Sequence, residues 1–361
     1  MNLGYEYTAK DEGIEMLDYQ RTAINAVREY ARTKSAEHQE YVEKICNSFN
    51  VDVNALINNV MFNLVTINFH PDRLSINGKI IMENLMEQGL YHGQFRTGTS
   101  NGGMTAYIGG DRFLWEQRLF FNSYPPDSIE RPKYGALNLF RYIDGASARF
   151  GSCFFILKHE IINRCTFAYG DSSTNPTTLC TSDTFIGVLA GLFKDVQQNS
   201  RLLNRVVSLE QEALAILLNP CDKIKDMGKN LDYCIETHIH GDISLVEDVD
   251  YFYIDESFQQ TSFAEQAELL CQKYGILLKW IPKRQVAIEE IGELYRGPKI
   301  PLLAQKIDSI FGNNQGIINA ALIGEASRDS IVHPEAWKAL GNEIELFQYF
   351  KQLWHTVAYF G

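Results

Sequence analysis

Apolar residues in the first part of the chain recur every three or four positions, which is the spacing of one face of a helix. Ile24, Val27 and Ala31 follow this spacing, and residues 51–67 carry a second apolar stripe. Proline disfavours helical conformation in the residue that precedes it, so Pro71 is expected to end the second stripe. The pattern therefore predicts that the first ~65 residues are helical.

Between residues 90 and 170 the pattern changes to short apolar and aromatic runs that are separated by glycines and polar turns. Runs of this length and composition are typical of β-strands. They are LYHGQF, YGALNLF, SCFFIL and CTFAYG, and a further alternating run, YCIETHIHG, follows at residues 233–241. We expect these segments to form the sheet of the protein.

Helical periodicity surrounds this strand-rich middle. A short helix is expected over residues 79–88, because Gly89 can adopt the left-handed conformation that often ends a helix. Residues 184–218 and the last ~60 residues are also predicted to be helical. Helices before, within and after a group of strands indicate an α+β fold rather than a regular βαβ series. We divide the chain into a helical N-terminal region, a catalytic α+β core and a helical C-terminal region, at residues 1–68, 69–282 and 283–361.

Composition and charge narrow the class of protein. Apolar residues make up 45% and charged residues 22% of the 361-residue chain, as in ordinary soluble globular proteins. The net charge of −12 argues against nucleic-acid binding, because neutralising phosphates requires a basic surface. No apolar run reaches the roughly 18 residues that a membrane-spanning helix requires, so we expect no membrane partner.

The cysteines and the N-terminal sequence bear on localisation. The seven cysteines are scattered and form no CxxC pair, which favours reduced thiols over a disulfide framework or a zinc finger. The N-terminal sequence has no basic segment followed by an apolar one, so it does not resemble a secretory signal. We therefore expect a cytoplasmic protein, or one that is secreted without a readable signal into a host or target cell.

The segment at residues 91–103 is the densest combination of polar side chains and glycines in the chain. On a strand, His92, Gln94 and Arg96 would share one face, because side chains alternate. The turn at residues 97–103 would offer backbone amides and hydroxyls that suit an anionic or ribose-bearing ligand. An ordinary hairpin, whose glycines serve only turn geometry, would give the same pattern.

Alternation in the run CIETHIHG predicts that Glu236, His238 and His240 lie on one face of a strand. Three ionisable groups in a row are costly to bury without a purpose. Glu236 could be a catalytic carboxylate that stabilises positive charge on the anomeric carbon of a ribose. His238 and His240 could instead be metal ligands, since HxH on a strand is a common pair of first ligands. A solvent-exposed face would need neither role.

Charged residues next to glycines at turns form another group of candidates. Arg131, Lys133 and Arg149 could supply local positive charge for a pyrophosphate, although the whole chain is acidic. Ordinary surface loops are the alternative. The FHPDR segment is interpreted as a helix end at which Asp72 pairs with Arg73.

Seven motifs along the chain resemble a bacterial family of domains of unknown function. In order, they are FHPDR, QFRTGTSNGG, IGGDR, ERPKYGAL, RFGSC, TFAYGDS and IETHIHG, and the resemblance covers about residues 69–258. That family is in turn distantly similar to the ADP-ribosyltransferase superfamily, whose members build a small, split and twisted β core around NAD⁺. The resemblance thus implies a mostly antiparallel α+β core of this kind, with helical additions at both ends.

The resemblance also implies roles for individual residues. Superfamily members use an Arg or His on an early strand, a Ser, Thr or Tyr on a middle strand, and a late Glu. The early position falls on His92 or Arg96, the middle one on Ser152 and the late one on Glu236, so Glu236 and Ser152 are the catalytic candidates. The residues expected to bind NAD⁺ are His92, Gln94, Arg96, Thr97, Ser100, Asn101, Arg149 and Phe154. Arginine-modifying members carry Glu or Gln where this chain has Cys234, which leaves the acceptor residue open.

The implied function is that of an NAD-dependent mono-ADP-ribosyltransferase, which cleaves the nicotinamide–ribose bond and transfers ADP-ribose to a target. The target is expected to be a protein side chain of a host or competitor enzyme, with arginine as one candidate, as for bacterial toxins and effectors. NAD⁺ is then a substrate, and no metal is implied. Two other classes stay open, namely a metal-dependent hydrolase that uses His238 and His240, and a non-enzymatic binding module.

Overall fold

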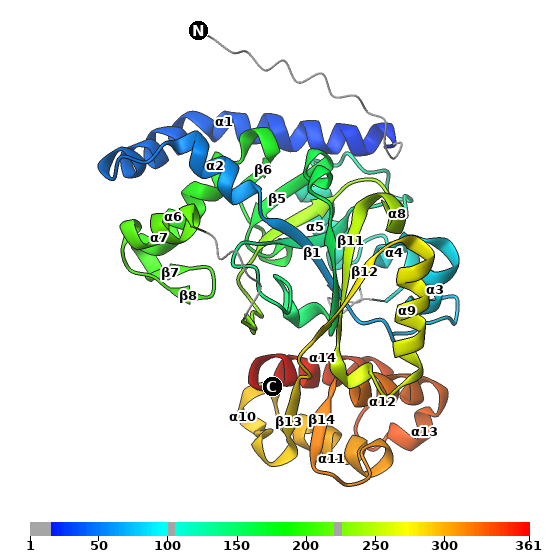
Figure 1. Ribbon diagram of the computed structural model, residues 1–361. Coiled ribbons are helices and arrows are strands. Elements are labelled where there is room, and N and C mark those ends of the chain that lie inside the picture. The colour runs from blue at the N-terminus through cyan, green and yellow to red at the C-terminus, as the bar shows by residue number, and fades with distance from the viewer. Residues whose placement is uncertain (1–15, 100–104, 220–225) are drawn as a thin grey trace.

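A sheet of eight strands forms the centre of the molecule in the part of the chain that the computed structural model describes, residues 16–99, 105–219 and 226–361 (Figure 1). The strand order is β12-β11-β4-β1-β3-β9-β5-β6, and neighbours run antiparallel except β11 and β12. These strands are β1 (Leu64–Phe69), β3 (Lys133–Asn138), β4 (Cys153–Leu157), β5 (Cys165–Tyr169), β6 (Leu179–Thr181), β9 (Ile235–Ile239), β11 (Val249–Asp255) and β12 (Leu277–Ile281). Together with the helices around the sheet, they confirm the α+β class.

Helices lie at both ends of this sheet. The long helix α1 (Asp18–Ser48) crosses one end, and the C-terminal helices gather at the other end (Figure 1). The longer helices between them are α2 (Val53–Met61), α3 (Ile81–Gln88), α5 (Asp111–Leu119), α6 (Ile186–Asn199), α7 (Glu210–Leu218) and α9 (Ser262–Tyr274). The C-terminal group comprises α10 (Glu293–Arg296), α11 (Lys299–Phe311), α12 (Ala320–Val332), α13 (Pro334–Trp337) and α14 (Glu343–Phe360), with the short strands β13 (Gln285–Ala287) and β14 (Ile317–Asn319).

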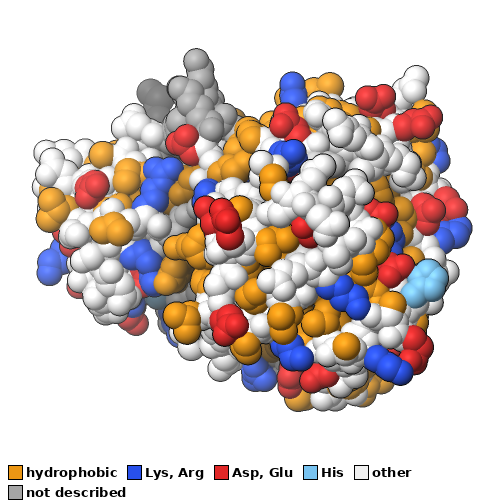
Figure 2. All heavy atoms as spheres, turned by 90° about the horizontal axis from the view of Figure 1, so that it is seen from below, with side chains coloured by type: hydrophobic (Ala, Val, Ile, Leu, Met, Phe, Trp, Pro, Cys, Tyr) orange, Lys and Arg blue, Asp and Glu red, His pale blue; other side chains and the backbone are white. Residues whose placement is uncertain are grey.

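The C-terminal group forms the face that is seen from below. Figure 2 shows Lys and Arg side chains interspersed with Asp and Glu and with apolar side chains on this face. The group is joined to the sheet through the buried Trp354 of α14, whose indole nitrogen donates to the carbonyl oxygen of Ala148 at 3.0 Å. The division of the chain into three regions is not decided by these elements and stays a prediction.

The central strands have one apolar and one polar face. On β1, Val65 and Ile67 enter the main hydrophobic core, whereas Thr66 lies on the other face. The register pairs Thr66 with Ala136 of β3, and Ala136 with Glu236 of β9. Because directly paired residues share a face of a sheet, Glu236 lies on the polar face together with Thr66.

The expectation of a helix up to residue 67 is wrong at its end. Helix α2 ends at Met61, and residues Leu64–Phe69 form β1, which pairs with β3 and β4 in the middle of the sheet. Nearly all of β1 is buried, and its β-branched Val65, Thr66 and Ile67 favour a strand. Thr66 and Asn68 alternate with apolar residues in this strand, but the run is short and closely follows the helical stripe of α2, so the periodicity of the longer window favoured a helix.

The strand expected over LYHGQF is also wrong beyond its first two residues. Only Leu90–Tyr91 forms a strand, β2, which pairs with β10 (Ile243–Ser244), and α4 (Gln94–Thr97) follows as a single helical turn. Gly93 precedes this turn, and Gly98 ends it with a φ of 69°, in the left-handed region that glycine tolerates. His92, Gln94 and Arg96 therefore do not alternate along a strand.

The structure confirms one of two expected helical segments and divides the other. The helix expected over residues 79–88 is confirmed as α3, with Gly89 at its end in the left-handed conformation (φ 65°). The helical block expected over residues 184–218 consists of α6 and α7 with a small hairpin of β7 (Arg201–Leu202) and β8 (Arg205–Val206) between them. The other runs expected as strands form β3, β4, β5 and β9.

Candidate active site

A pocket of about 360 Å³ lies on the polar face of the sheet. Its floor comes from β1, β3 and β9 through Thr66, Tyr134 and Glu236, and its walls come from segments far apart in the sequence. Arg112 of α5 and Lys351 of α14 line it together with the loop that holds Asp171 and Ser172. The fold thus brings the 90–100 segment and Glu236 to one cavity.

Five residues that the sequence analysis proposed line this pocket. They are His92, Gln94, Thr97, Arg149 and Glu236. Burial, with the neighbouring cations Arg96 and Lys133, lowers the pKa of His92 to about 4, so its imidazole is neutral near pH 7. Their roles in catalysis and in NAD⁺ binding stay predictions.

Three other proposed residues lie outside the pocket lining. Arg96 belongs to α4, and its side chain pairs with Glu130, with 2.6 Å between Nη1 and Oε1, instead of lining the pocket. Phe154 is fully buried and stacks on Tyr253 with 4.7 Å between ring centroids. Ser152 is buried next to the pocket, where its hydroxyl lies 3.0 Å from Nδ1 of His70. The remaining proposed residues, Ser100 and Asn101, lie outside the described residues.

Glu236 is held by a serine and a histidine. Its carboxylate accepts from the Ser172 hydroxyl and lies 2.8 Å from Nε2 of His238, and the Ser172 amide donates to the second oxygen at 3.4 Å. Among the described residues, no lysine or arginine forms an ion pair with Glu236. The side chain is 7% exposed and reaches the pocket. The negative charge of this carboxylate is therefore available to a ligand.

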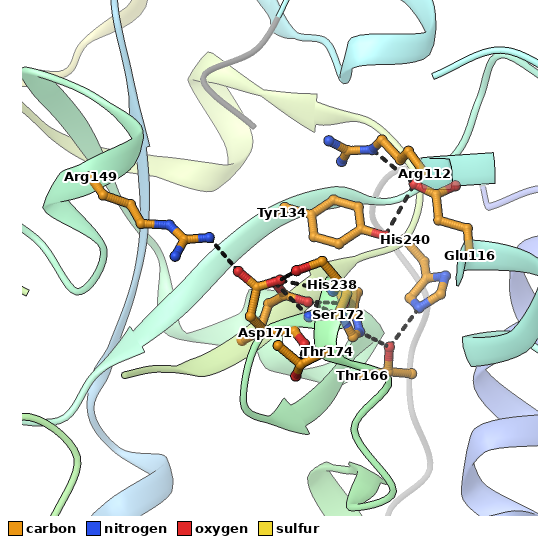
Figure 3. Close-up of polar contacts among 12 residues, drawn as sticks. Arg112, Glu116, Tyr134, Arg149, Thr166, Asp171, Ser172, Thr174, His238 and His240 are labelled. Atoms are coloured by element: carbon orange, nitrogen blue, oxygen red, sulfur yellow. Dashed lines mark hydrogen bonds and ion pairs between the residues drawn. The ribbon is translucent and has the colours of Figure 1, made fainter. Parts of the chain in front are cut away.

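The two histidines of the HIH segment lie behind Glu236 rather than in the pocket. Thr166 Oγ1 lies 3.0 Å from Nδ1 of His238 and 3.0 Å from Nε2 of His240 (Figure 3). The Tyr124 hydroxyl lies 2.6 Å from Nδ1 of His240. All four ring nitrogens thus face protein side chains. Within the described ranges, no group of three His, Cys, Asp or Glu side chains is arranged to hold a metal ion. The geometry gives no support to the metal-dependent hydrolase.

A second buried carboxylate, Glu116 of α5, is held in the opposite way. It contacts Arg112 at 3.2 Å and accepts from the Tyr134 hydroxyl at 3.1 Å (Figure 3). It also contacts Arg131 at 3.2 Å. The Arg112 guanidinium also lies over the Tyr134 ring, 4.2 Å from its centroid. Two guanidiniums thus neutralise Glu116, while Arg112 and Tyr134 extend into the pocket lining.

Cations dominate the rest of the pocket. Among the described residues, the lining includes Arg73, Arg112, Arg149 and Lys351, against the carboxylates Asp171 and Glu236. Burial lowers the pKa of Lys351, and the nearby Arg149 adds to this shift. Arg73, Arg112 and Arg149 each have a carboxylate partner, in Asp72, Glu116 and Asp171, so what the lining offers an anionic ligand is their guanidinium N–H groups rather than uncompensated charge.

The carboxylate of Asp171 belongs to the wall of this site. Arg149 forms an ion pair with it, and the backbone amide of Ser173 donates to it at 2.8 Å. Burial alone would raise the pKa of Asp171, but the Arg149 charge and the Ser173 hydrogen bonds outweigh burial and lower it. Asp171 is therefore ionised near pH 7 and fixes the loop that places Ser172 against Glu236.

The sequence analysis missed several residues that the structure brings to the pocket. The pairing of Asp72 with Arg73 is confirmed, at 3.5 Å, but the FHPDR segment follows β1 instead of a helix, and its His70 and Arg73 line the pocket. Burial lowers the pKa of His70 well below its usual value. Ser172 lay in the motif TFAYGDS, but nothing in that motif showed which strand its hydroxyl would face.

The comparisons with known proteins agree with the motif-based resemblance at the level of the family. The chain belongs to the family described as Protein of unknown function (DUF3626), which matches residues 64–360. The match extends beyond the motif span of residues 69–258 and includes the C-terminal helices. No curated protein matches the chain. Within the described residues, none of the helices has the length and apolar character that crossing a membrane requires.

Proposed function

We propose that this protein is an NAD-dependent mono-ADP-ribosyltransferase that cleaves the nicotinamide–ribose bond of NAD⁺ and transfers ADP-ribose to a protein target. The observation that carries the proposal is the pairing of Glu236, a carboxylate without a cationic partner among the described residues, with a cation-rich pocket. A dinucleotide needs both features, because its pyrophosphate is anionic and its ribose develops positive charge during cleavage. The sheet beneath the pocket is mostly antiparallel, as the resemblance implies, although it is one continuous sheet of eight strands rather than a small split core.

The charges divide the pocket into two parts with different tasks. Arg73, Arg149 and Lys351 can neutralise the pyrophosphate, which arginine contacts through paired hydrogen bonds. The rings of Trp115 and Tyr134 also line the pocket and offer apolar surfaces on which the nicotinamide or adenine ring can stack. This arrangement would hold the dinucleotide with its nicotinamide ribose next to Glu236.

The reaction requires little covalent chemistry from the protein. The bond between the nicotinamide nitrogen and the anomeric carbon breaks, and its electron pair leaves with nicotinamide, which becomes neutral. Glu236 accepts hydrogen bonds from ribose hydroxyls and stabilises the positive charge that develops on the sugar. A nucleophile on the target then bonds to the anomeric carbon and releases its proton to solvent. The contribution of the protein is therefore positioning and electrostatic stabilisation.

The test is the release of nicotinamide from NAD⁺ labelled in the nicotinamide ring, with and without a cell lysate as a source of acceptors. The full chain should release nicotinamide, and lysate proteins should acquire label when the adenine part is labelled instead. Glu236→Gln should lower the rate by on the order of 10³-fold, because the amide no longer stabilises the positive charge.

Glu247→Gln is the matched control, since it removes one carboxylate from an exposed position on α8 (Leu245–Asp248), away from the pocket lining. The control should keep the wild-type rate. Full activity of Glu236→Gln, or no release of nicotinamide by the wild-type protein with any acceptor, would overturn the proposal.

A further inference from the structure

A continuous series of buried side chains connects Tyr124 to Glu236. The hydroxyl of Tyr124 lies 2.6 Å from His240 Nδ1, and His240 Nε2 lies 3.0 Å from Thr166 Oγ1. Thr166 Oγ1 in turn lies 3.0 Å from His238 Nδ1, and His238 Nε2 lies 2.8 Å from Glu236 Oε1. Each side chain behind Glu236 is at most 1% exposed. Only the last member of the series, Glu236, lines the pocket.

Aromatic side chains pack around both imidazoles of this series and restrict the rotation of their rings. The ring of Phe120 lies edge-on to both, with 5.2 Å between centroids in each case. Tyr134 packs edge-on against His238, and Tyr124 stacks on His240. Neither ring can flip without displacing these aromatic side chains.

The donors and acceptors can be assigned from the two ends of the series. At one end, an ionised Glu236 can only accept, so His238 Nε2 carries a proton and donates. At the other end, the Tyr124 hydroxyl has one acceptor among the described residues, His240 Nδ1. His240 Nε2–H then donates to Thr166, and the Thr166 hydroxyl donates to His238 Nδ1. Every hydrogen bond thus points toward Glu236.

The reverse order fails at both ends. If His238 Nδ1 donated to Thr166, then Thr166 would donate to His240 Nε2, and His240 Nδ1 would donate to Tyr124. The proton of the Tyr124 hydroxyl would then have no acceptor among the described residues, and an unpaired buried polar group is destabilising. At the other end, a His238 protonated only on Nδ1 would present the lone pair of Nε2 to the Glu236 oxygen 2.8 Å away. Burial lowers the pKa of His240 well below its usual value, which disfavours an imidazolium there.

We infer that Tyr124, His240, Thr166 and His238 are positioning residues, which hold both imidazoles as neutral Nε2–H tautomers and thereby orient Glu236 in its ionised form. The role of Glu236 in turnover rests on the proposed function, whereas the order of the hydrogen bonds does not. Because a line of dipoles that all point toward a carboxylate stabilises its charge, breaking the series in the middle should weaken turnover more than binding.

The first experiment reads the tautomers directly and needs no substrate. Nitrogen-15 NMR of the full chain, labelled at histidine and assigned with His238→Gln and His240→Gln, distinguishes protonated from unprotonated ring nitrogens. Both residues should show a protonated Nε2 and an unprotonated Nδ1 at pH 7. A protonated Nδ1 on either histidine would overturn the inference.

The second experiment breaks the series at Thr166. Thr166→Val removes the hydroxyl and should lower kcat for nicotinamide release by roughly tenfold, the equivalent of one hydrogen bond, with little change in KM. Thr166→Ser restores the hydroxyl and should recover the rate to within about twofold.

Thr237→Val provides the matched control. Thr237 is fully buried on the same sheet, next to His238, but faces the apolar core, and its hydroxyl has no hydrogen-bond partner in the described structure. This variant should keep the wild-type kcat. Equal losses in Thr166→Val and Thr237→Val would show that Thr166 acts only through packing, and this result would overturn the inference.

The two experiments separate the inference from the proposed function. If the wild-type protein releases no nicotinamide, the proposed function fails, and the tautomers still decide the order of the hydrogen bonds. If Thr166→Val does not fold, the NMR result and the recovery in Thr166→Ser still decide the inference. Nε2–H tautomers together with an unchanged kcat in folded Thr166→Val would leave the order intact but overturn the positioning role.

Discussion

Two buried carboxylates lie at or next to the pocket, and they differ in how their negative charge is compensated. Glu116 is completely buried between Arg112 and Arg131, and Glu236 is 7% exposed and held by Ser172 and His238. A carboxylate that is paired with two guanidiniums has no charge left for a ligand, and its role is to keep those guanidiniums in place. A carboxylate without a lysine or arginine partner can still attract positive charge from a ligand. Charge compensation, and not burial, separates the structural carboxylate from the candidate catalytic one.

The comparison also explains the positive character of the pocket. Because Glu116 fixes Arg112 through an ion pair at 3.2 Å, the guanidinium keeps its place in the pocket wall next to Gln94, whose side-chain oxygen accepts from it at 3.2 Å. Glu236 also lines the pocket, but it has no lysine or arginine partner among the described residues. One carboxylate thus fixes the Arg112 wall of the pocket, and under the proposed function the other would face the reacting sugar.

The largest effect expected from this comparison is on stability. Glu116→Gln should lower the free energy of unfolding by about 3–5 kcal/mol, because it leaves two buried guanidiniums without their counter-charge. Glu236→Gln should lower it by less than about 1 kcal/mol, since an amide oxygen still accepts from Ser172 and His238. Urea unfolding followed by circular dichroism measures both values. Equal losses in the two variants would remove the distinction between the carboxylates.

Lowering the pH should destabilise the Glu236 side of the pocket before the Glu116 side. Burial lowers the pKa of His70 and of His240, and lowers the pKa of His355 to about 3, whereas the guanidiniums around Glu116 do not titrate in this range. The unfolded chain binds protons near pH 6.5 and the folded chain does so only at lower pH, so stability falls as the pH drops. The expected loss is on the order of 1 kcal/mol for each of these histidines between pH 6.5 and 5.5.

Urea unfolding at a series of pH values measures this dependence. In His355→Gln, the unfolding free energy should depend less steeply on pH, because the contribution of one of the buried histidines is removed. His159→Gln changes an exposed imidazole and serves as the control, with an unchanged slope. A wild-type stability that is flat from pH 6.5 to 5.5 would show that these imidazoles are protonated in the folded protein.

The smallest effect separates the two serines that lie near the pocket. Ser172→Ala should lower kcat for nicotinamide release by roughly tenfold, because it removes a hydrogen bond to the charged carboxylate of Glu236. Ser152→Ala should leave kcat within about threefold of wild type, since its hydroxyl bonds His70 and does not reach Glu236. Steady-state assays of the two variants decide the point. A larger loss in Ser152→Ala would restore the serine that the superfamily resemblance favoured.

Local patterns predicted the strand that carries Glu236 but not the surroundings of this residue. Alternation in CIETHIHG correctly predicted β9 and placed Glu236 and His238 on one face. The same pattern could not show that His238 and His240 are buried behind Glu236, because burial depends on α5 and the Phe120–Tyr124 turn that cover them. His238 and His240 were open to interpretation as metal ligands because the sequence did not show that they are buried behind Glu236.

The pocket as a whole was only partly predictable, because strand pairing between distant segments assembles it. His70 and Arg73 follow β1, whose alternation is too short to outweigh the helical stripe that precedes it, and Lys351 comes from the last helix of the chain. Conversely, Arg96 and Phe154 belong to the right segments but face away, since a glycine-bounded helical turn and an aromatic stack direct them elsewhere. Side-chain direction in irregular segments depends on tertiary contacts that no local pattern records.

The most direct test of the central claim is a crystal structure of Glu236→Gln in complex with NAD⁺, in which slow turnover preserves the bound dinucleotide. We expect the nicotinamide ribose to place its hydroxyls within hydrogen-bond distance of residue 236, and the pyrophosphate to contact the guanidiniums of Arg73 or Arg149. A dinucleotide that binds elsewhere, or a ribose directed away from residue 236, would contradict the account.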